Sequence, residues 1–140
     1  MKDAFGGIVS IAFIAVFLVI VSGVLGLTVS YTKAFRMKNI VISAIEQYEG
    51  YGCFSASSGC RDKIEEGAKK IGYSSNVDLN CPSSYEKVEG RFCYRKDPTN
   101  GGNFIYKIIT QVDIDIPIIN KLTGFSFFQI NGDTRTIQNR

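Results

Sequence analysis

Four cysteines are the residues of this chain whose type and spacing point most directly to chemistry. They stand at Cys53, Cys60, Cys81 and Cys93, and thiols can form disulfides, bind zinc or carry out redox exchange. The chain has no C-x-x-C pair, the spacing typical of zinc knuckles and thiol oxidoreductases. Disulfides are therefore favoured. Of the three connectivities that four cysteines permit, we favour Cys53–Cys60 with Cys81–Cys93, because both pairs close short local loops.

Evidence for catalysis is sparse. The 140 residues include no His, the residue most often used for acid–base chemistry. Asp113 and Asp115 have the spacing of paired carboxylates or calcium ligands, but their alternation with apolar residues is typical of the solvent face of a half-buried strand. The chain also lacks a nucleophile motif, a phosphate loop and a basic run. We expect no enzyme activity, metal, cofactor, nucleic acid or small-molecule substrate.

The element that precedes the cysteines opens with an uncharged stretch from Phe5 to Tyr31, "FGGIVSIAFIAVFLVIVSGVLGLTVSY". A signal peptide has an apolar core of about 7 to 15 residues, which is shorter than this stretch. At about 1.5 Å per residue, a helix here covers the roughly 30 Å hydrocarbon core of a bilayer. We therefore predict a retained transmembrane helix, with a weaker alternative of cleavage near its end. Small residues that favour close helix packing are Gly6, Gly7, Ser22, Gly23 and Gly26.

The helix is predicted to continue beyond the membrane, because the next segment contains no Pro, and no Gly before Gly50. Its apolar residues recur at helical spacing and predict a buried face: Ala34, Met37, Val41, Ala44, Ile45 and Tyr48. One helix from Phe5 to Glu49 is about 65–70 Å long, far more than an anchor needs. We divide the chain into a transmembrane segment (1–31), an amphipathic continuation (32–50) and a head (51–140).

The head combines one short helix with several strands. "RDKIEEGAKKIG" has Ile64, Ala68 and Ile71 on one side and predicts a helix of about three turns. Antiparallel strands are predicted in "RFCYRK", "NFIYKIITQVDIDI" and "GFSFFQINGDTRTI". In the second strand, one face is apolar (Val112, Ile114, Ile116) and the other is polar and solvent-facing (Gln111, Asp113, Asp115). The predicted fold class is α+β, a long N-terminal helix packed on a three-stranded or larger antiparallel sheet.

Two signals conflict on the side of the membrane that holds the head. Lys33, Arg36 and Lys38 outnumber Lys2, and the positive-inside rule places the more basic flank in the cytoplasm. Four cysteines in a small, His-free head instead favour an oxidising, exported location. We give the cysteines more weight and expect an extracellular head on a single-pass membrane protein, or on an extracellular filament.

This layout resembles that of type IV pilins and pseudopilins. Within that group the chain is most similar to the TadE-like subunits of Tad-type pili of Gram-positive bacteria, through "AFGGIVSIAFIAVFLVIVSGVLGLTVSYTKAFRMKNIVISAIEQ" and "VDIDIPIINKLTGFSFFQINGDTRTI". The resemblance implies a structural subunit that assembles with copies of itself or related subunits. The alternative is a membrane-anchored extracellular protein that binds a ligand or belongs to a secretion machine without polymerising.

The resemblance also implies a short leader that ends in Gly. Gly6 or Gly7 could end such a leader here. In the family, a Glu at the fifth mature position neutralises a neighbour's N-terminal amine. The corresponding residue is Ala12 after cleavage at Gly7, or Ile11 after cleavage at Gly6, so this charge pairing is not transferred. Either the leader is kept, or the subunit joins a filament by apolar packing alone.

Overall fold

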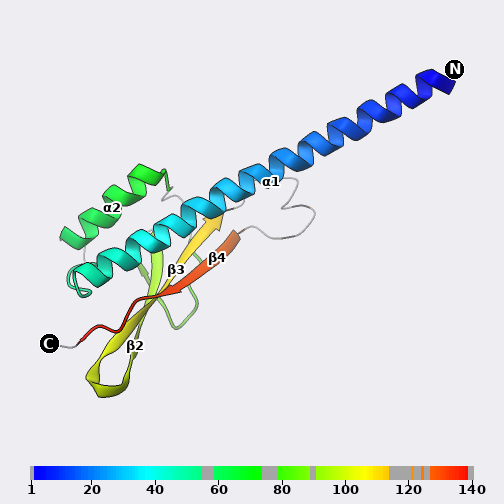
Figure 1. Cartoon of the computed structure of the whole chain (residues 1–140). Coiled ribbons are helices and arrows are strands. Elements are labelled where there is room, and N and C mark those ends of the chain that lie inside the picture. The colour runs from blue at the N-terminus through cyan, green and yellow to red at the C-terminus, as the bar shows by residue number, and fades with distance from the viewer. Residues whose placement is uncertain are drawn as a thin grey trace.

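The computed structural model describes residues 2–54, 59–73, 79–88, 91–113, 121, 124 and 127–138, with side chains from residue 5 onward. It confirms the α+β fold, in which a long N-terminal helix packs on an antiparallel sheet (Figure 1). The elements are α1 (Lys2–Gln47), α2 (Gly59–Ile71), β1 (Glu86–Val88), β2 (Phe92–Pro98), η1 (Asn100–Gly102), β3 (Phe104–Asp113) and β4 (Phe127–Asp133).

Helix α1 runs without a break for 46 residues, which corresponds to about 69 Å. It ends two residues before Glu49, the predicted limit, and the chain then turns through left-handed backbone. Glu49, Gly50 and Gly52 have φ values of 51°, 79° and 69°. The amide of Gly50 donates a 2.9 Å hydrogen bond back to the carbonyl of Ile45, as in the C-terminal caps that glycine favours.

The four strands form an antiparallel sheet in the order β1-β2-β3-β4, so each strand pairs with its neighbour in sequence. Strands β2, β3 and β4 fall on the three predicted segments, while Ile114 and Ile116, predicted for the apolar face of the second, lie outside the described residues. Strand β1 was not predicted, because three residues with the burial pattern exposed–exposed–buried carry no readable alternation. Its position is set by pairing with β2, in which Val88 lies opposite Phe92.

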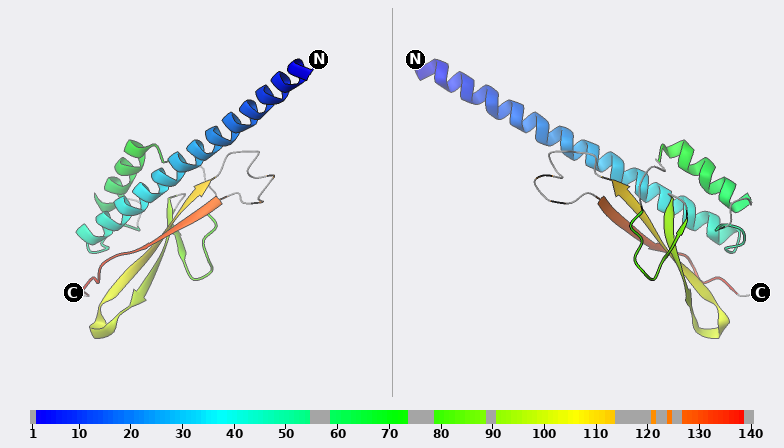
Figure 2. Two further views of the ribbon diagram at one scale, coloured as in Figure 1. Left: turned by 45° about the vertical axis from the view of Figure 1, so that its right-hand side comes forward. Right: turned by 180° about the vertical axis from the view of Figure 1, so that it is seen from behind.

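The C-terminal half of α1 crosses one face of this sheet, while the N-terminal half extends beyond it (Figures 1 and 2). Five of the six residues predicted for its buried face are buried: Ala34, Met37, Val41, Ala44 and Ile45. Most of them join Phe92 and Ile108 of the sheet in the main core. Tyr48, the sixth, is 37% exposed, because it lies beyond the last turn of the helix.

Helix α2 lies along α1 in the antiparallel sense. Its buried residues are Cys60, Ile64 and Ala68, and Ile71 is half-buried. Gly67 lies against α1, where a Cβ atom would come within 2.7 Å of Ile40 Cγ2. A residue without a side chain is therefore what lets the two helices pack at this distance.

The opposite face of the sheet is partly covered by the chain that precedes β1. Leu79, Cys93 and Ile109 form a small apolar cluster there. Gln111, expected on a solvent face, is only 3% exposed, so that expectation was wrong. The backbone amide of Asn80 donates a 3.1 Å hydrogen bond to Gln111 Oε1, and the adjacent Cys81 is tied to β2 by a disulfide with Cys93.

Candidate functional site: the exposed half of the long helix

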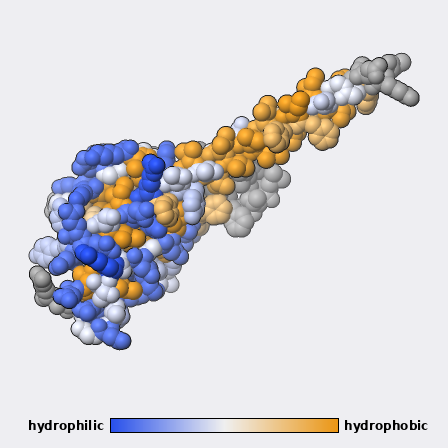
Figure 3. All heavy atoms as spheres, in the orientation of Figure 1, coloured by the Kyte–Doolittle hydropathy of each residue, from blue (hydrophilic) through white to orange (hydrophobic). Residues whose placement is uncertain are grey.

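The N-terminal half of α1 is apolar and uncovered. Its large side chains from Phe5 to Tyr31 are exposed, apart from the half-buried Leu27, with Phe5 at 75% and Phe13 at 73%. Figure 3 shows this half as a hydrophobic rod leaving a head of mixed polarity. By length and composition the helix is able to cross a membrane. Leaving so much apolar surface in water is unfavourable in free energy. Lipid or other apolar surfaces must therefore cover it.

Three hydroxyl side chains along this rod form hydrogen bonds within the helix. The hydroxyls of Ser22, Thr28 and Thr32 donate to the carbonyls of Leu18, Val24 and Thr28, each at 2.8 Å. Such bonds to the carbonyl four residues earlier remove an unpaired donor from an apolar environment. These residues therefore do not interrupt the apolar character of the rod.

The five predicted packing residues do not form a single stripe. Gly6 and Gly7 lie near the free end of α1, and a Cβ atom at either would have no neighbour within 4 Å. Ser22, Gly23 and Gly26 lie about 24 Å further along the axis, and Ser22 is roughly 160° around the helix from Gly6. The rod thus offers two small-residue patches separated by about 24 Å along its axis.

The head begins to cover α1 at Ala34, which is fully buried. Its carbonyl oxygen accepts a 3.1 Å hydrogen bond from the buried hydroxyl of Thr110 on β3. Ala34 also packs with Val112 and Ile130 in a second small core cluster. The covered part of the helix therefore begins at Ala34.

The head is held together by two disulfides, Cys53–Cys60 and Cys81–Cys93. These are the pairs with the short loops that the sequence favours. The first joins the turn after α1 to the start of α2, and the second ties the loop before β1 to β2. All four sulfurs are used in these bonds.

The described residues contain no group of three or more His, Cys, Asp or Glu able to hold a metal ion. Asp113 is exposed, and Asp115 lies outside the described residues.

An ion pair that the sequence did not predict connects α2 to the start of β2. The Arg91 guanidinium donates to both carboxylate oxygens of Glu65, with distances of 3.1 Å from Nε and 2.6 Å from Nη2. This hydrogen bonding, together with the charges of Arg91 and Arg61, lowers the pKa of Glu65. The partners are 26 residues apart, so no local pattern reveals the pair.

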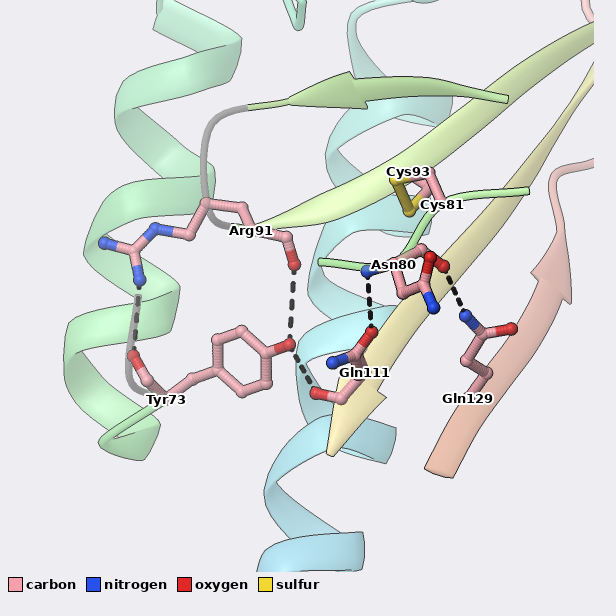
Figure 4. The surroundings of a disulfide bond; sticks show 7 residues. All are labelled: Tyr73, Asn80, Cys81, Arg91, Cys93, Gln111 and Gln129. Atoms are coloured by element: carbon pink, nitrogen blue, oxygen red, sulfur yellow. Dashed lines mark hydrogen bonds between the residues drawn. A yellow bond between two sulfur atoms is a disulfide. The ribbon is translucent and has the colours of Figure 1, made fainter. Parts of the chain in front are cut away.

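Tyr73 extends this connection to β3 (Figure 4). Arg91 Nη1 donates to the Tyr73 carbonyl at 3.3 Å, and the Tyr73 hydroxyl donates to the Gln111 carbonyl at 2.7 Å. Burial raises the pKa of this hydroxyl. Beside it, Gln129 Nε2 donates to the carbonyl of Asn80 at 2.7 Å, next to the Cys81–Cys93 disulfide. The end of α2 and the loop before β1 are thereby bonded to the sheet.

The head has one further feature suited to recognition, an open pocket of about 410 Å³ at the end far from the rod. Aromatic rings and polar groups line it together, and Tyr51 is 89% exposed. Lys96 Nζ lies 3.8 Å from the centre of the Phe104 ring. The lining residues are Tyr48, Glu49, Gly50, Tyr51, Lys96, Phe104, Tyr106 and Gln138.

No protein-family model, curated protein or solved structure matches this chain.

Proposed function

We propose that the chain is a structural subunit of a type IV or Tad-like pilus or pseudopilus. The observation that carries the proposal is the uncovered apolar half of a single 46-residue helix whose other half is built into the head. In the membrane this half is solvated by lipid. On assembly, the same surface packs against the rods of neighbouring subunits and forms the apolar core of the filament, while the head faces outward.

The length of the rod supports this function over simple anchoring. The exposed stretch from Phe5 to Thr32 covers about 42 Å, compared with roughly 30 Å for the hydrocarbon core. The remaining 15 residues of α1 continue the same axis into the head. A continuous rod fixes the angle between head and membrane segment, which a repeating filament needs and a tethered domain does not. The two disulfides support an extracellular head.

Gly26→Leu tests the role of the small-residue patch in assembly. A leucine there pushes neighbouring rods apart, so we expect filaments, or incorporation into them, to fall at least several-fold. The head should keep its stability, because Gly26 lies outside the buried part of α1. Val24→Phe, which adds bulk on roughly the opposite face of the helix, is the matched control and should assemble better than Gly26→Leu.

The measurement is electron microscopy of sheared surface material, with quantification of this chain in that fraction and mass spectrometry of its N-terminus. The N-terminal residue tests whether a leader ending at Gly6 or Gly7 is removed. Normal assembly of Gly26→Leu contradicts the packing role. Absence of the chain from filaments contradicts the proposed function.

A second candidate function is a membrane-anchored extracellular protein that binds a ligand, or serves a secretion machine, without polymerising. The distal pocket favours it, because rings and charged groups at the far end of the head are placed to meet a molecule outside the membrane. This candidate predicts the chain only in the membrane fraction, with a ligand affinity that Tyr51→Ala reduces.

A further inference from the structure

Cationic side chains from two helices lie at the level where α1 passes from exposed rod into head. Helix α1 supplies Lys33 and Arg36, and the last turn of α2 supplies Lys69 and Lys70; all four are exposed. The antiparallel packing of the helices brings the end of α2 to this level, with Lys33 Nζ 3.7 Å from the position of a Cβ atom at Gly72. We call these four residues the basic collar.

A shallow pocket of about 250 Å³ is bordered by the α1 residues of the collar and by Ile71 at the end of α2. Val29 and Ile71 give it apolar walls, while Lys33 and Arg36 give it positive charge. The hydroxyl hydrogens of Thr28 and Thr32, which also line it, are used in bonds to α1 carbonyls. The cations are therefore the groups available to recognise an anion, beside apolar walls that suit a neighbouring hydrocarbon chain.

Acidic groups near the collar offset part of its charge. Glu66 pairs with Lys70 at 2.7 Å, and Asp113 lines a neighbouring pocket together with Lys33. Glu65, one helical turn from Lys69, is engaged by Arg91 and Arg61 and also interacts electrostatically with Lys69. Within the described part of the chain, Lys33 and Arg36 make no ion pair or side-chain hydrogen bond. Among the described residues, Lys33 and Arg36 thus keep the positive charge of the collar available to a partner.

The collar lies at the depth where lipid headgroups begin. If about 20 residues span the hydrocarbon core, a core that starts near Ile8 ends near Leu27, and the next few residues lie in the headgroup layer. Tyr31 and Phe35, 50% and 42% exposed, are aromatic residues of the kind that concentrate at this interface. The end of α2 lies at the same level along α1 as these two residues, because Gly72 is next to Lys33.

We propose that the basic collar binds the phosphate groups of anionic phospholipids in the leaflet from which the head emerges. In this site the phosphate lies between the cations. The upper part of the lipid packs against Val29 and Ile71. It holds α2, and with it the head, at the membrane surface. The inference does not depend on polymerisation, nor on which side of the membrane carries the head.

The test uses the full chain reconstituted in phosphatidylcholine vesicles with trace spin-labelled phosphatidylglycerol or phosphatidylcholine. The motionally restricted fraction in electron paramagnetic resonance spectra gives the relative association constant of the two lipids. A cation near an anionic surface contributes about fivefold, so we expect phosphatidylglycerol to be preferred at least threefold. The ratio of the two association constants should fall towards one in the Lys33→Gln/Arg36→Gln variant, and also in high salt.

Two further variants make the test specific. Lys69→Gln/Lys70→Gln should also lower the preference, because α2 is part of the site. Lys63→Gln/Lys96→Gln removes the same charge from positions outside the collar and should leave the preference unchanged. Equal association of both lipids with the unaltered chain overturns the proposal. The proposal is also overturned if Lys33→Gln/Arg36→Gln lowers the lipid preference and Lys69→Gln/Lys70→Gln does not. The same holds if Lys63→Gln/Lys96→Gln lowers the preference equally.

Discussion

Replacing Gly67 with alanine probes the contact through which α2 packs against α1. The new Cβ atom would lie 2.7 Å from Ile40 Cγ2 and 3.2 Å from Ile40 Cδ1. Carbon atoms in contact are usually about 3.5–4.0 Å apart, so the first approach is short by about 0.8 Å or more. The substitution therefore forces Ile40 or the whole of α2 to move.

Two opposing terms set the expected size of the effect. Alanine in place of glycine inside a helix stabilises it by about 1 kcal/mol. Overpacking of a well-packed contact costs about 1–3 kcal/mol. We therefore expect Gly67→Ala to lower the free energy of unfolding by up to about 2 kcal/mol. In an Ile40→Ala background, where the obstructing atoms are gone, the same change should stabilise the protein by about 1 kcal/mol.

The assay is a double-mutant cycle on the full chain in detergent micelles. Denaturant unfolding of the head can be followed by tyrosine fluorescence, since the chain has seven Tyr and no Trp. The difference between the two backgrounds is the interaction free energy, expected at about 1–3 kcal/mol. If Gly67→Ala has the same effect in both backgrounds, the contact with Ile40 is not what requires glycine, and our account of the helix packing is wrong.

Two more predictions concern the head. The double substitution Cys81→Ser with Cys93→Ser opens a loop with a sequence separation of 12 and should lower the free energy of unfolding by about 3 kcal/mol. It should also speed hydrogen exchange in the segment that covers Gln111. Unchanged exchange there would show that the disulfide does not hold this segment in place. Because the pKa of Glu65 is lowered in the folded state, its contribution to stability is present above its usual value of 4.5 and is lost as the pH falls through the folded pKa. Glu65→Gln should therefore reduce the loss of stability below about pH 4.5 in acid-titration unfolding curves, and an identical acid dependence in both proteins contradicts the role of the Arg91–Glu65 pair.

Features set by neighbouring residues could be predicted from the sequence. The apolar run of α1 and the helical spacing of Met37, Val41 and Ile45 predict one long helix, because each position repeats a local periodicity. Its end near Gly50 follows from the ease with which glycine adopts positive φ. The short disulfide loops follow similarly from the spacing of the cysteines along the chain.

Features that depend on distant residues could not be predicted. The polar side of β3 has the alternation of an exposed face, yet Gln111 is buried by a loop that comes 31 residues earlier. Strand β1 is too short to carry a pattern of its own. In the candidate site, the sequence identified the small residues of the rod, but their division into two patches about 24 Å apart emerges only when they are placed along one continuous helix.

The sequence by itself thus determined a rod, its apolar half, the place where it stops and the pieces of the head, because hydrophobic periodicity and backbone preference act over a few residues. Only the tertiary structure decided which faces are covered and which charges meet. Arg91 joins Glu65 on α2, and Gly72 comes to lie beside Lys33 because α2 folds back antiparallel along α1. Such contacts arise from packing between segments far apart in the chain, and no local pattern encodes them.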